Sequence, residues 1–321
     1  MPMGQEFHPD LRRIARVLPR GPFTRRTLPV VRALTRLQAL RISRYVEVAA
    51  LPSGINVRLH RPQNTDNAGA ALLWIHGGGY VIGSAAQDDR LCRRFAHRLG
   101  VPVVAVDYRL APKHPYPAAL EDCYEAFAWL TRLPGIDPGR VAIGGASAGG
   151  GLTAALALLA RDRGELVPLF QLLVYPMVDD RSSDRPGIRD RRYRLWSPTS
   201  NRLGWTAYLR GADPQIAVPS RHTDLSGLPP GWIGVGTLDP LHDENVEYAR
   251  RLEDAGVACD IEIVSGAFHG FDIVAPTAGV SRAFFDRQCE TLRKAFSSRS
   301  LGLFHPAEPS ARLQAVCRYV D

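Results

Sequence analysis

The sequence predicts an α/β fold in which a mostly parallel central sheet is covered by helices on both faces. Beyond residue 44, short apolar runs rich in β-branched residues alternate with segments of helical periodicity. The stretches 68–87 and 141–160 contain no Asp, Glu, Lys or Arg and are interrupted by glycine runs, which is typical of a buried strand followed by a turn. A content of 45% hydrophobic and 22% charged residues is ordinary for a globular chain of 321 residues.

The same patterns place the individual elements. We expect strands at residues 45–49, 56–60, 72–76, 101–107, 141–144, 170–175, 232–236 and 260–264. We expect helices at residues 90–99, 118–130, 152–159, 245–255 and 282–295. The first two strands flank the hairpin-like turn Pro52-Ser53-Gly54 and should therefore run antiparallel.

The alternation of strands and helices stops between Pro176 and Pro230. This stretch is polar, contains the arginine-rich segment Arg181–Arg194 and continues into an aromatic segment. An insertion of this length between two strands is typically functional. Because no internal repeat or low-complexity linker is visible, we expect one domain over 45–297 with the insertion 176–230. Residues 1–44 precede this domain, and the extension 298–321, to which the sequence assigns no role, follows it.

The net charge of +8 is concentrated at the N-terminus. Residues 1–44 hold ten arginines and two acids, whereas the rest of the chain holds 30 basic and 30 acidic residues. Leu11, Ile14, Ala15 and Leu18 recur there at helical spacing, which predicts a solvated amphipathic helix. No finger, RRM or basic-zipper pattern accompanies the charge, so we expect no nucleic-acid partner.

We expect neither a membrane span nor a metal or other cofactor. Although both uncharged stretches are long enough to span a bilayer, their glycine runs argue for strand and turn. The chain has no H-E-x-x-H and no C-x-x-C motif. Five cysteines without such spacing, and an N-terminus without a secretory pattern, favour a reduced cytoplasmic compartment.

The strongest chemical signal is Gly145-Ala146-Ser147-Ala148-Gly149, a G-x-S-x-G motif between a predicted strand and a predicted helix. A serine nucleophile must stand on a sharp turn, and small neighbours let the strand and the helix approach closely enough to form it. The helix after Ser147 would also direct amide groups toward an oxyanion. The strand before the motif argues against its alternative use as a G-x-x-x-G helix-packing face.

A second glycine motif, His76-Gly77-Gly78-Gly79, follows another predicted strand. A run of glycines lets the backbone turn several N–H groups toward one point, which an oxyanion hole requires. An ordinary glycine turn is the alternative, and the presence of the serine motif makes the functional interpretation the better one.

A nucleophilic serine needs a general base and a carboxylate that orients it. Among nine histidines, His269 is the preferred base because it lies in a loop after the last predicted strand; His242 is the next best. Asp239, which follows strand 232–236, is the preferred acid, and Asp243 is the alternative. The resulting order of Ser147, Asp239 and His269 is that of α/β-hydrolases.

With these residues in place, the sequence resembles the hormone-sensitive lipase family, the bacterial family IV esterases, from about residue 44 to 297. Six motifs in the right order carry the resemblance: His76–Gly79, Tyr108–Pro112, His114–Ala118, the serine motif with Gly150, Asp239–Leu241 and His269–Phe271.

The resemblance implies a carboxylesterase whose oxyanion hole consists of the N–H groups of Gly77, Gly78 and Ala148. It also implies a helical cap built from the N-terminal helices of residues 1–44 and the insertion 176–230. Ala146 departs from the family, in which the residue before the serine is commonly Asp or another polar residue. The extension 298–321 continues past the family's usual end.

We therefore expect a cofactor-independent serine esterase that hydrolyses small-molecule esters with short to medium acyl chains. Lactone, amide or carbamate hydrolysis and acyl transfer are alternatives on the same site, and a non-catalytic ligand receptor is a weaker one. The sequence leaves a homodimer open. The acyl pocket has four candidate wall residues, for which packing of the cap itself is an equal alternative: Trp196, Trp205, Tyr208 and Leu209.

The segment Arg181–Arg194 suggests one more hypothesis. Its six arginines and two acids would attract esters that carry a negative charge away from the scissile bond. The competing interpretation, which we favour, is a mobile and solvated loop without influence on the substrate.

Overall fold

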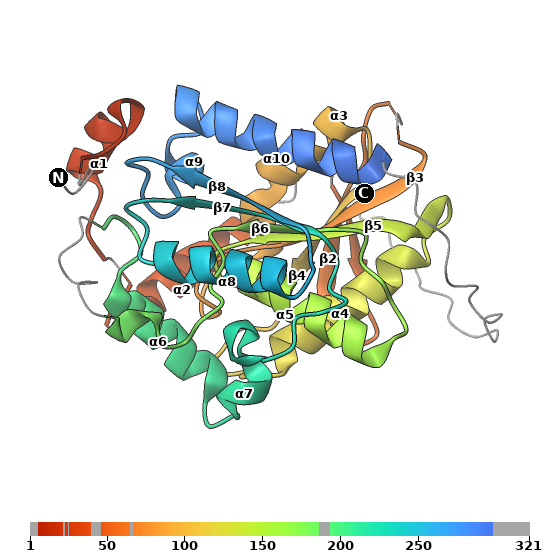
Figure 1. Cartoon of the computed structure of the whole chain (residues 1–321), viewed down its shortest axis with the longest axis horizontal. Helices are drawn as coiled ribbons and strands as arrows, with labels where there is room; N and C mark the ends of the chain where they lie inside the picture. The colour runs from red at the N-terminus through yellow and green to blue at the C-terminus, as the bar shows by residue number, and fades with distance from the viewer. Residues whose placement is uncertain are drawn as a thin grey trace.

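The computed structural model describes residues 6–21, 23–24, 26–39, 46–64, 67–185 and 193–297. Within these ranges, a single sheet has the strand order β1-β2-β4-β3-β5-β6-β7-β8 (Figure 1). The strands are β1 (Glu47–Ala50), β2 (Asn56–His60), β3 (Gly69–Ile75), β4 (Val103–Asp107), β5 (Ile136–Ala146), β6 (Gln171–Val174), β7 (Gly231–Gly236) and β8 (Cys259–Val264).

The sheet is parallel except at one end. β1 pairs antiparallel with β2, and β2 pairs antiparallel with β4, whereas all pairings from β4 to β8 are parallel. The predicted mostly parallel sheet with an antiparallel start is therefore confirmed. Because β3 lies between β4 and β5, the carboxyl ends of β3 and β5 are neighbours, and both glycine motifs follow these ends.

Helices cover both faces of the sheet, as expected (Figure 1). α3 and α10 cover one face, and α4, α5 and α8 cover the other. The helices are α1 (Arg12–Val17), α2 (Leu28–Ala39), α3 (Asp89–Leu99), α4 (Ala118–Thr131), α5 (Ala148–Arg163), α6 (Pro198–Leu209), α7 (Pro214–Ala217), α8 (His242–Asp254), α9 (Phe271–Val274) and α10 (Gly279–Ser297). Short 3-10 helices occur at Pro9–Leu11, Ala85–Asp88, Ser182–Asp184 and Pro219–Arg221.

The spacing of apolar residues explains how these helices dock. In α3, the side chains of Cys92, Phe95, Ala96 and Leu99 are buried, and they recur at the three- and four-residue spacing of one helix face. α3 ends at Gly100, which adopts the left-handed conformation with φ 66° that commonly terminates helices.

The sequence did not predict α6, the helix in the insertion. It begins with Ser197, whose hydroxyl accepts the backbone N–H of Ser200, and Pro198 occupies the first turn. Both are ordinary signals for the start of a helix. The apolar face of α6, which includes the buried Trp205 and Tyr208, is short, and the residues around it are polar. The sequence therefore shows no clear helical pattern there.

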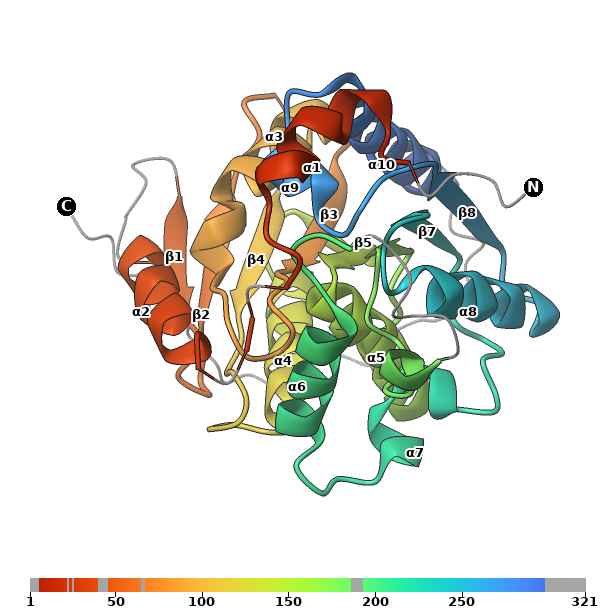
Figure 2. The ribbon, with the colours of Figure 1, turned by 90° about the vertical axis from the view of Figure 1, so that its left-hand side faces the viewer.

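The N-terminal segment packs on the body as an amphipathic element. Leu11 and Ala15 are fully buried, which confirms the predicted apolar face. The N–H of His8 donates to the carbonyl of Gly266 at 2.9 Å, and Asp10 accepts the N–H of Val280 at 3.0 Å. Figure 2 shows α1 beside α9, at the end of the molecule where α6 also lies. The C-terminal extension 298–321 lies outside the described residues.

Among the described residues, no helix combines the length and the apolar character that a membrane span needs.

Candidate active site

Ser147 occupies the sharp turn between β5 and α5 that the sequence predicted. Its backbone adopts φ 58° and ψ −119°, a conformation that is unfavourable for a residue with a side chain and is typical of functional turns. The N–H of Ser147 donates to the carbonyl of Val174 on the neighbouring strand at 2.9 Å. A Cβ at Gly149 would lie 2.0 Å from the carbonyl oxygen of Ile75, so the first turn of α5 approaches β3 only because this residue is glycine.

A continuous hydrogen-bond chain joins the three predicted triad residues. Ser147 Oγ lies 2.9 Å from His269 Nε2, and His269 Nδ1 lies 2.7 Å from Asp239 Oδ2. An ionised carboxylate can only accept hydrogen bonds, so His269 Nδ1 carries the proton and Nε2 accepts from the serine hydroxyl. This is the tautomer that a general base for Ser147 requires.

The triad residues come from three loops at the carboxyl ends of strands. Asp239 follows β7 and is fully buried, and its second oxygen accepts the N–H of Leu241 at 2.8 Å. His269 follows β8 and is 7% exposed. The parallel sheet therefore brings residues up to 122 positions apart to one edge, which is where ligands bind in open α/β sheets.

The two alternatives that the sequence left open are paired with each other. His242 Nδ1 lies 2.7 Å from Asp243 Oδ1 at the start of α8, where both side chains are partly exposed. Neither has a hydrogen bond to Ser147 among the described contacts. The geometry thus favours Asp239 and His269 over Asp243 and His242.

The loop His76–Gly79 packs directly against the serine turn. A Cβ on Gly77 would lie 3.3 Å from the Cβ of Ser147, and Gly78 has φ 129°, which side chains rarely adopt. Among the described residues, the N–H groups of Gly77 and Gly78 donate to no other residue. They are therefore available to an oxyanion that forms next to Ser147, as is expected of an oxyanion hole. Ala148, the third predicted donor, occupies the first position of α5.

His76 supports this loop from inside the protein. Its Nδ1 is 2.8 Å from the carbonyl oxygen of Gly77, its carbonyl accepts the hydroxyl of Tyr108 at 2.9 Å, and the two rings stack at 4.1 Å. Burial lowers the pKa of His76, so the imidazole is neutral at physiological pH. Its role is to hold the glycine loop in place.

The four candidates for the acyl pocket divide into two groups. The ring of Trp196 lies 6.1 Å from that of His269 and is nearly buried. Trp205 and Tyr208 instead pack against Tyr80, with ring centroids 5.1 Å and 4.1 Å away. Leu209 is partly buried against the same apolar cluster. The latter three join α6 to the body, whereas Trp196 lies beside the histidine.

The arginine-rich segment is described only at its two ends. Arg189, Arg191 and Arg192 lie outside the described residues. Arg181 and Arg185 both form ion pairs with Asp179, at 2.8 Å and 3.1 Å.

The expectation that the arginine-rich segment is solvated is wrong for Arg194. The residue is 8% exposed, and its guanidinium donates to the carbonyl of Tyr193 at 2.7 Å and covers the ring of Phe7 at 4.8 Å. It also donates to the carbonyl of Ala15, which joins the insertion to α1. The described arginines of this segment are thus engaged within the protein, which weakens the hypothesis that the segment attracts charged esters.

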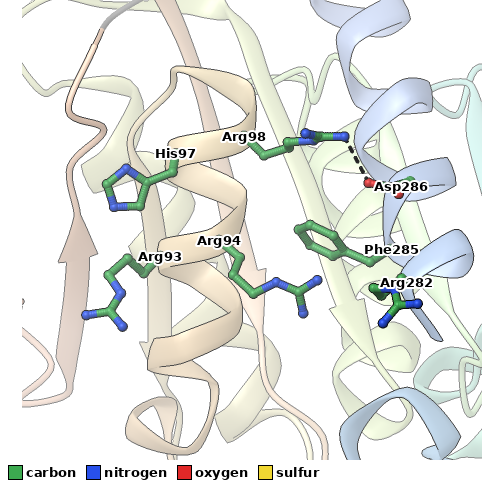
Figure 3. Close-up of a pocket in the computed structure, with 7 residues that line it drawn as sticks. All are labelled: Arg93, Arg94, His97, Arg98, Arg282, Phe285 and Asp286. Atoms are coloured by element: carbon green, nitrogen blue, oxygen red, sulfur yellow. Dashed lines mark hydrogen bonds and ion pairs between the residues drawn. The ribbon is translucent and has the colours of Figure 1, made fainter. Parts of the chain in front are cut away.

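A surface hollow of about 380 Å³ between α3 and α10 contains none of the candidate site residues (Figure 3). Arg98 on α3 forms an ion pair with Asp286 on α10 at 3.0 Å, and the guanidinium of Arg94 lies 3.9 Å from the ring centroid of Phe285. These contacts bind two helices to each other. Among the described residues, no three His, Cys, Asp or Glu side chains are grouped as metal ligands would be.

Tyr175 and Asp272, which lie near the site, were not indicated by the sequence patterns. The ring of Tyr175 lies 4.7 Å from that of His269, and its hydroxyl donates to Asp272 Oδ1 at 2.7 Å. Asp272 stands three residues after His269, and this proximity was the only signal in the sequence.

A strand-order of this kind, with a serine turn after β5 and an acid and a histidine after β7 and β8, defines the α/β-hydrolase class. The chain belongs to the α/β hydrolase fold family, whose model matches residues 72–273, more than half of the sequence.

Known proteins agree with this assignment. The chain is 39% identical over 259 residues to the carboxylic ester hydrolase LipN of Mycobacterium tuberculosis, covering 75% of this chain and 68% of the relative. It is 41% identical over 228 residues to an ethyl acetate hydrolase of Pseudomonas putida, covering 67% and 70%. A solved structure titled bacterial heroin esterase matches with a TM-score of 0.80 and 37% identity, covering 91% of this chain and 98% of the other. The expected fold, the resemblance to the hormone-sensitive lipase family and the enzyme class of carboxylic ester hydrolase are confirmed.

Proposed function

We propose that this carboxylic ester hydrolase is a serine esterase that acts through an acyl-enzyme on Ser147, with His269 as the general base and Asp239 as the acid that orients it. The observation that carries the proposal is the hydrogen-bond chain of 2.9 Å and 2.7 Å through these three side chains. Their burial adds support, because a base shielded from water keeps one tautomer and one orientation.

The reaction then follows from the positions of the protons. Ser147 Oγ attacks the ester carbonyl as its proton passes to His269 Nε2, and the imidazolium that forms is stabilised by Asp239. His269 returns the proton to the leaving alcohol, and Ser147 is left acylated. A water molecule, deprotonated by His269, attacks the acyl group, and the acid leaves as Ser147 regains its proton.

The N–H groups of Gly77, Gly78 and Ala148 would stabilise the tetrahedral oxyanion in both halves of the reaction. The proposal is supported by the free N–H groups of the two glycines and by the position of Ala148 at the start of a helix of 16 residues. Donors held in place before the reaction stabilise developing charge without reorganisation, and losing one commonly costs a factor of about 100 to 1,000 in kcat.

We infer a preference for short to medium acyl chains. The bulky ring of Trp196 lies 6.1 Å from the imidazole of His269 and restricts the space beside the reacting carbonyl. The relative from Pseudomonas putida is named for ethyl acetate, a short ester. The substrate would be a small-molecule ester, and no further partner is required for the chemistry.

The division into body and cap is part of the proposal. Residues 45–297 would form the catalytic domain, and residues 1–44 with the insertion 176–230 would form the cap. In support, Arg32 on α2 donates to the carbonyl of Val81, shortly after the glycine loop, at 2.8 Å and to the carbonyl of Ala111 at 2.5 Å. A cytoplasmic location stays a prediction, with four unpaired buried cysteines in the described part of the chain consistent with a reducing compartment.

A chain-length series of p-nitrophenyl esters tests the proposed specificity. We expect kcat/KM to be highest for acetate to hexanoate and to fall for longer chains. Trp196→Ala should shift the optimum toward longer chains, because it removes the ring beside His269. Leu209→Ala, which truncates a side chain in the packed layer between α6 and the body, is the control and should lower stability without changing the order of the substrates. An unchanged order in Trp196→Ala would contradict the role given to Trp196.

A further inference from the structure

Two carboxyl groups line a small void on the inner side of the serine turn. The void measures about 20 Å³, and its walls include Gly77 of the glycine loop and Ala146, the residue before the serine. Asp88 reaches it from the 3-10 helix before α3, and Asp272 reaches it from α9. Asp88 and Asp272 therefore line the same void, beside Ala146.

Asp272 is connected to the catalytic histidine by one aromatic side chain. The hydroxyl of Tyr175 donates to Asp272 Oδ1 at 2.7 Å, and the ring of Tyr175 meets that of His269 at 4.7 Å and 60°. Tyr175 is 1% exposed and its N–H donates to Gly234 at 2.7 Å, so the ring has little freedom to move. Burial raises the pKa of Asp272, and the hydrogen bond from Tyr175 and the charge of His269 oppose this shift.

Asp88 is held in the opposite wall. Its Oδ2 accepts the indole N–H of Trp74 at 2.8 Å, and the residue is 8% exposed. Burial raises the pKa of Asp88 to about 7, and Asp272 adds to this shift. Two carboxyl groups in one buried space ionise together only at a cost in free energy, and they titrate as a coupled pair.

The other titratable groups around Asp88 do not play the same part as Asp272. Its chain neighbour Asp89 also raises the pKa of Asp88, but Asp89 is paired with Arg58 at 2.6 Å and lies 3.4 Å from His60. Burial raises the pKa values of the Cys92 thiol and of the Tyr108 and Tyr175 hydroxyls far above neutrality, so these groups stay uncharged. Within the described residues, Asp272 is thus the acid across the void that is coupled to Asp88.

We propose that Tyr175 and Asp272 are positioning residues for His269, and that Asp88 controls through the shared void whether Asp272 is charged when the imidazolium forms. The inference rests on the proposed function, since it needs His269 as the base. Tyr175 fixes the imidazole in place, and the carboxylate of Asp272 adds negative charge near it. Protonation of Asp272 removes that charge and disfavours the imidazolium.

The pH dependence of kcat/KM tests this chain of contacts, because the two aspartates act with opposite signs. Asp272→Asn keeps an acceptor for Tyr175 but removes the charge, so the midpoint of the acid limb should move to lower pH by about 0.5 units. Asp88→Asn keeps an acceptor for Trp74 and lets Asp272 ionise more readily, so the midpoint should move to higher pH by a similar amount.

Two more variants complete the design. Tyr175→Phe retains the ring contact with His269 and removes the hydrogen bond to Asp272, so its midpoint should shift in the same direction as that of Asp272→Asn and by less. If Asp272→Asn does not fold, Tyr175→Phe tests the same contact in its place. Asp286→Asn makes the same chemical change on the surface of α10 and should leave the midpoint unchanged.

Labelling of Ser147 by a fluorophosphonate, followed in each variant, separates this inference from the proposed function. If Ser147 is labelled but either aspartate variant leaves the midpoint unmoved, or both move it in the same direction, the inference is wrong and the proposed function stands. If Ser147 of the wild type is not labelled, both are wrong. Opposite shifts with intact labelling support the inference.

Discussion

Among the described residues, two Asp–His pairs share the same close contact, and one of them, Asp239–His269, is joined to Ser147 by a hydrogen bond. In each pair, a carboxylate oxygen lies 2.7 Å from an imidazole Nδ1. The side chains of Asp239 and His269 are 0% and 8% exposed, whereas those of Asp243 and His242 are 41% and 21% exposed. The contact distance is the same, and the surroundings differ.

The difference shows which surroundings suit an Asp–His pair to the proposed catalytic role. Asp239 is fixed by a second hydrogen bond from Leu241 and is closed off from water, so His269 has one orientation, with Nε2 directed at Ser147. The pair Asp243–His242 at the start of α8 is partly exposed, and in such a solvent-screened environment an ion pair contributes little. Burial and the hydrogen bond to Ser147 distinguish Asp239–His269 from Asp243–His242.

The largest effect is expected from breaking the buried pair, with the partly exposed pair as the comparison. Asp239→Asn should lower kcat by about ten-thousand-fold, because the amide favours the wrong tautomer of the imidazole. Asp243→Asn should leave kcat within about a factor of two, as is usual for a partly exposed pair. Steady-state kinetics on p-nitrophenyl butyrate, with circular dichroism to verify folding, measures both. Equal losses of kcat in the two variants would show that the buried pair and the partly exposed pair do not differ in function.

A stability effect is expected one residue further along α8, at Glu244. Its Oε1 accepts the N–H groups of Val178 and Asp179 at 2.8 Å and 3.1 Å, which ties the start of the insertion to α8. Burial raises the pKa of Glu244 from 4.5 to about 8. The folded protein therefore binds more protons than the unfolded chain between these values, and the stability contributed by this group is lost as the pH rises from 4.5 to 8.

Glu244→Gln should remove this pH dependence, since glutamine keeps the acceptor and cannot ionise. We expect the Tm of the wild type to fall by several degrees relative to that of the variant between pH 5 and pH 8.5. Differential scanning calorimetry of both proteins measures the difference, with Glu247→Gln on the exposed face of the same helix as the control. Parallel curves for wild type and Glu244→Gln would show that Glu244 does not titrate in this window.

The smallest effect is expected at Tyr208, whose hydroxyl is buried without a hydrogen-bond partner among the described residues. Tyr208→Phe keeps the ring that stacks on Tyr80 at 4.1 Å and removes the unpaired group. Stability should stay the same or rise by about 1 kcal/mol, and kcat should not change. A clear loss of activity on esters would instead assign the hydroxyl to the substrate.

The sequence predicted most of the sheet, and it singled out the three side chains that the structure joins by hydrogen bonds, because both depend on local signals. Apolar runs marked the strands, and Ser147, Asp239 and His269 each follow one of them. Tyr175 and Asp272 could not be paired in this way, because they are 97 residues apart and meet only through the order of the strands. The prediction of a solvated Arg194 failed for a related reason. The carbonyl of Ala15 and the ring of Phe7, which contact its guanidinium, lie far away in the sequence.

The central claim is that Ser147, activated by His269, forms the acyl-enzyme. The most direct test is to react the protein with a fluorophosphonate and map the modified residue by peptide mass spectrometry, with His269→Ala and Ser147→Ala in parallel. We predict one modification, on Ser147 of the wild type, with labelling strongly slowed in His269→Ala and absent in Ser147→Ala. Modification of another serine, or labelling of Ser147 at the same rate in His269→Ala, would contradict the account.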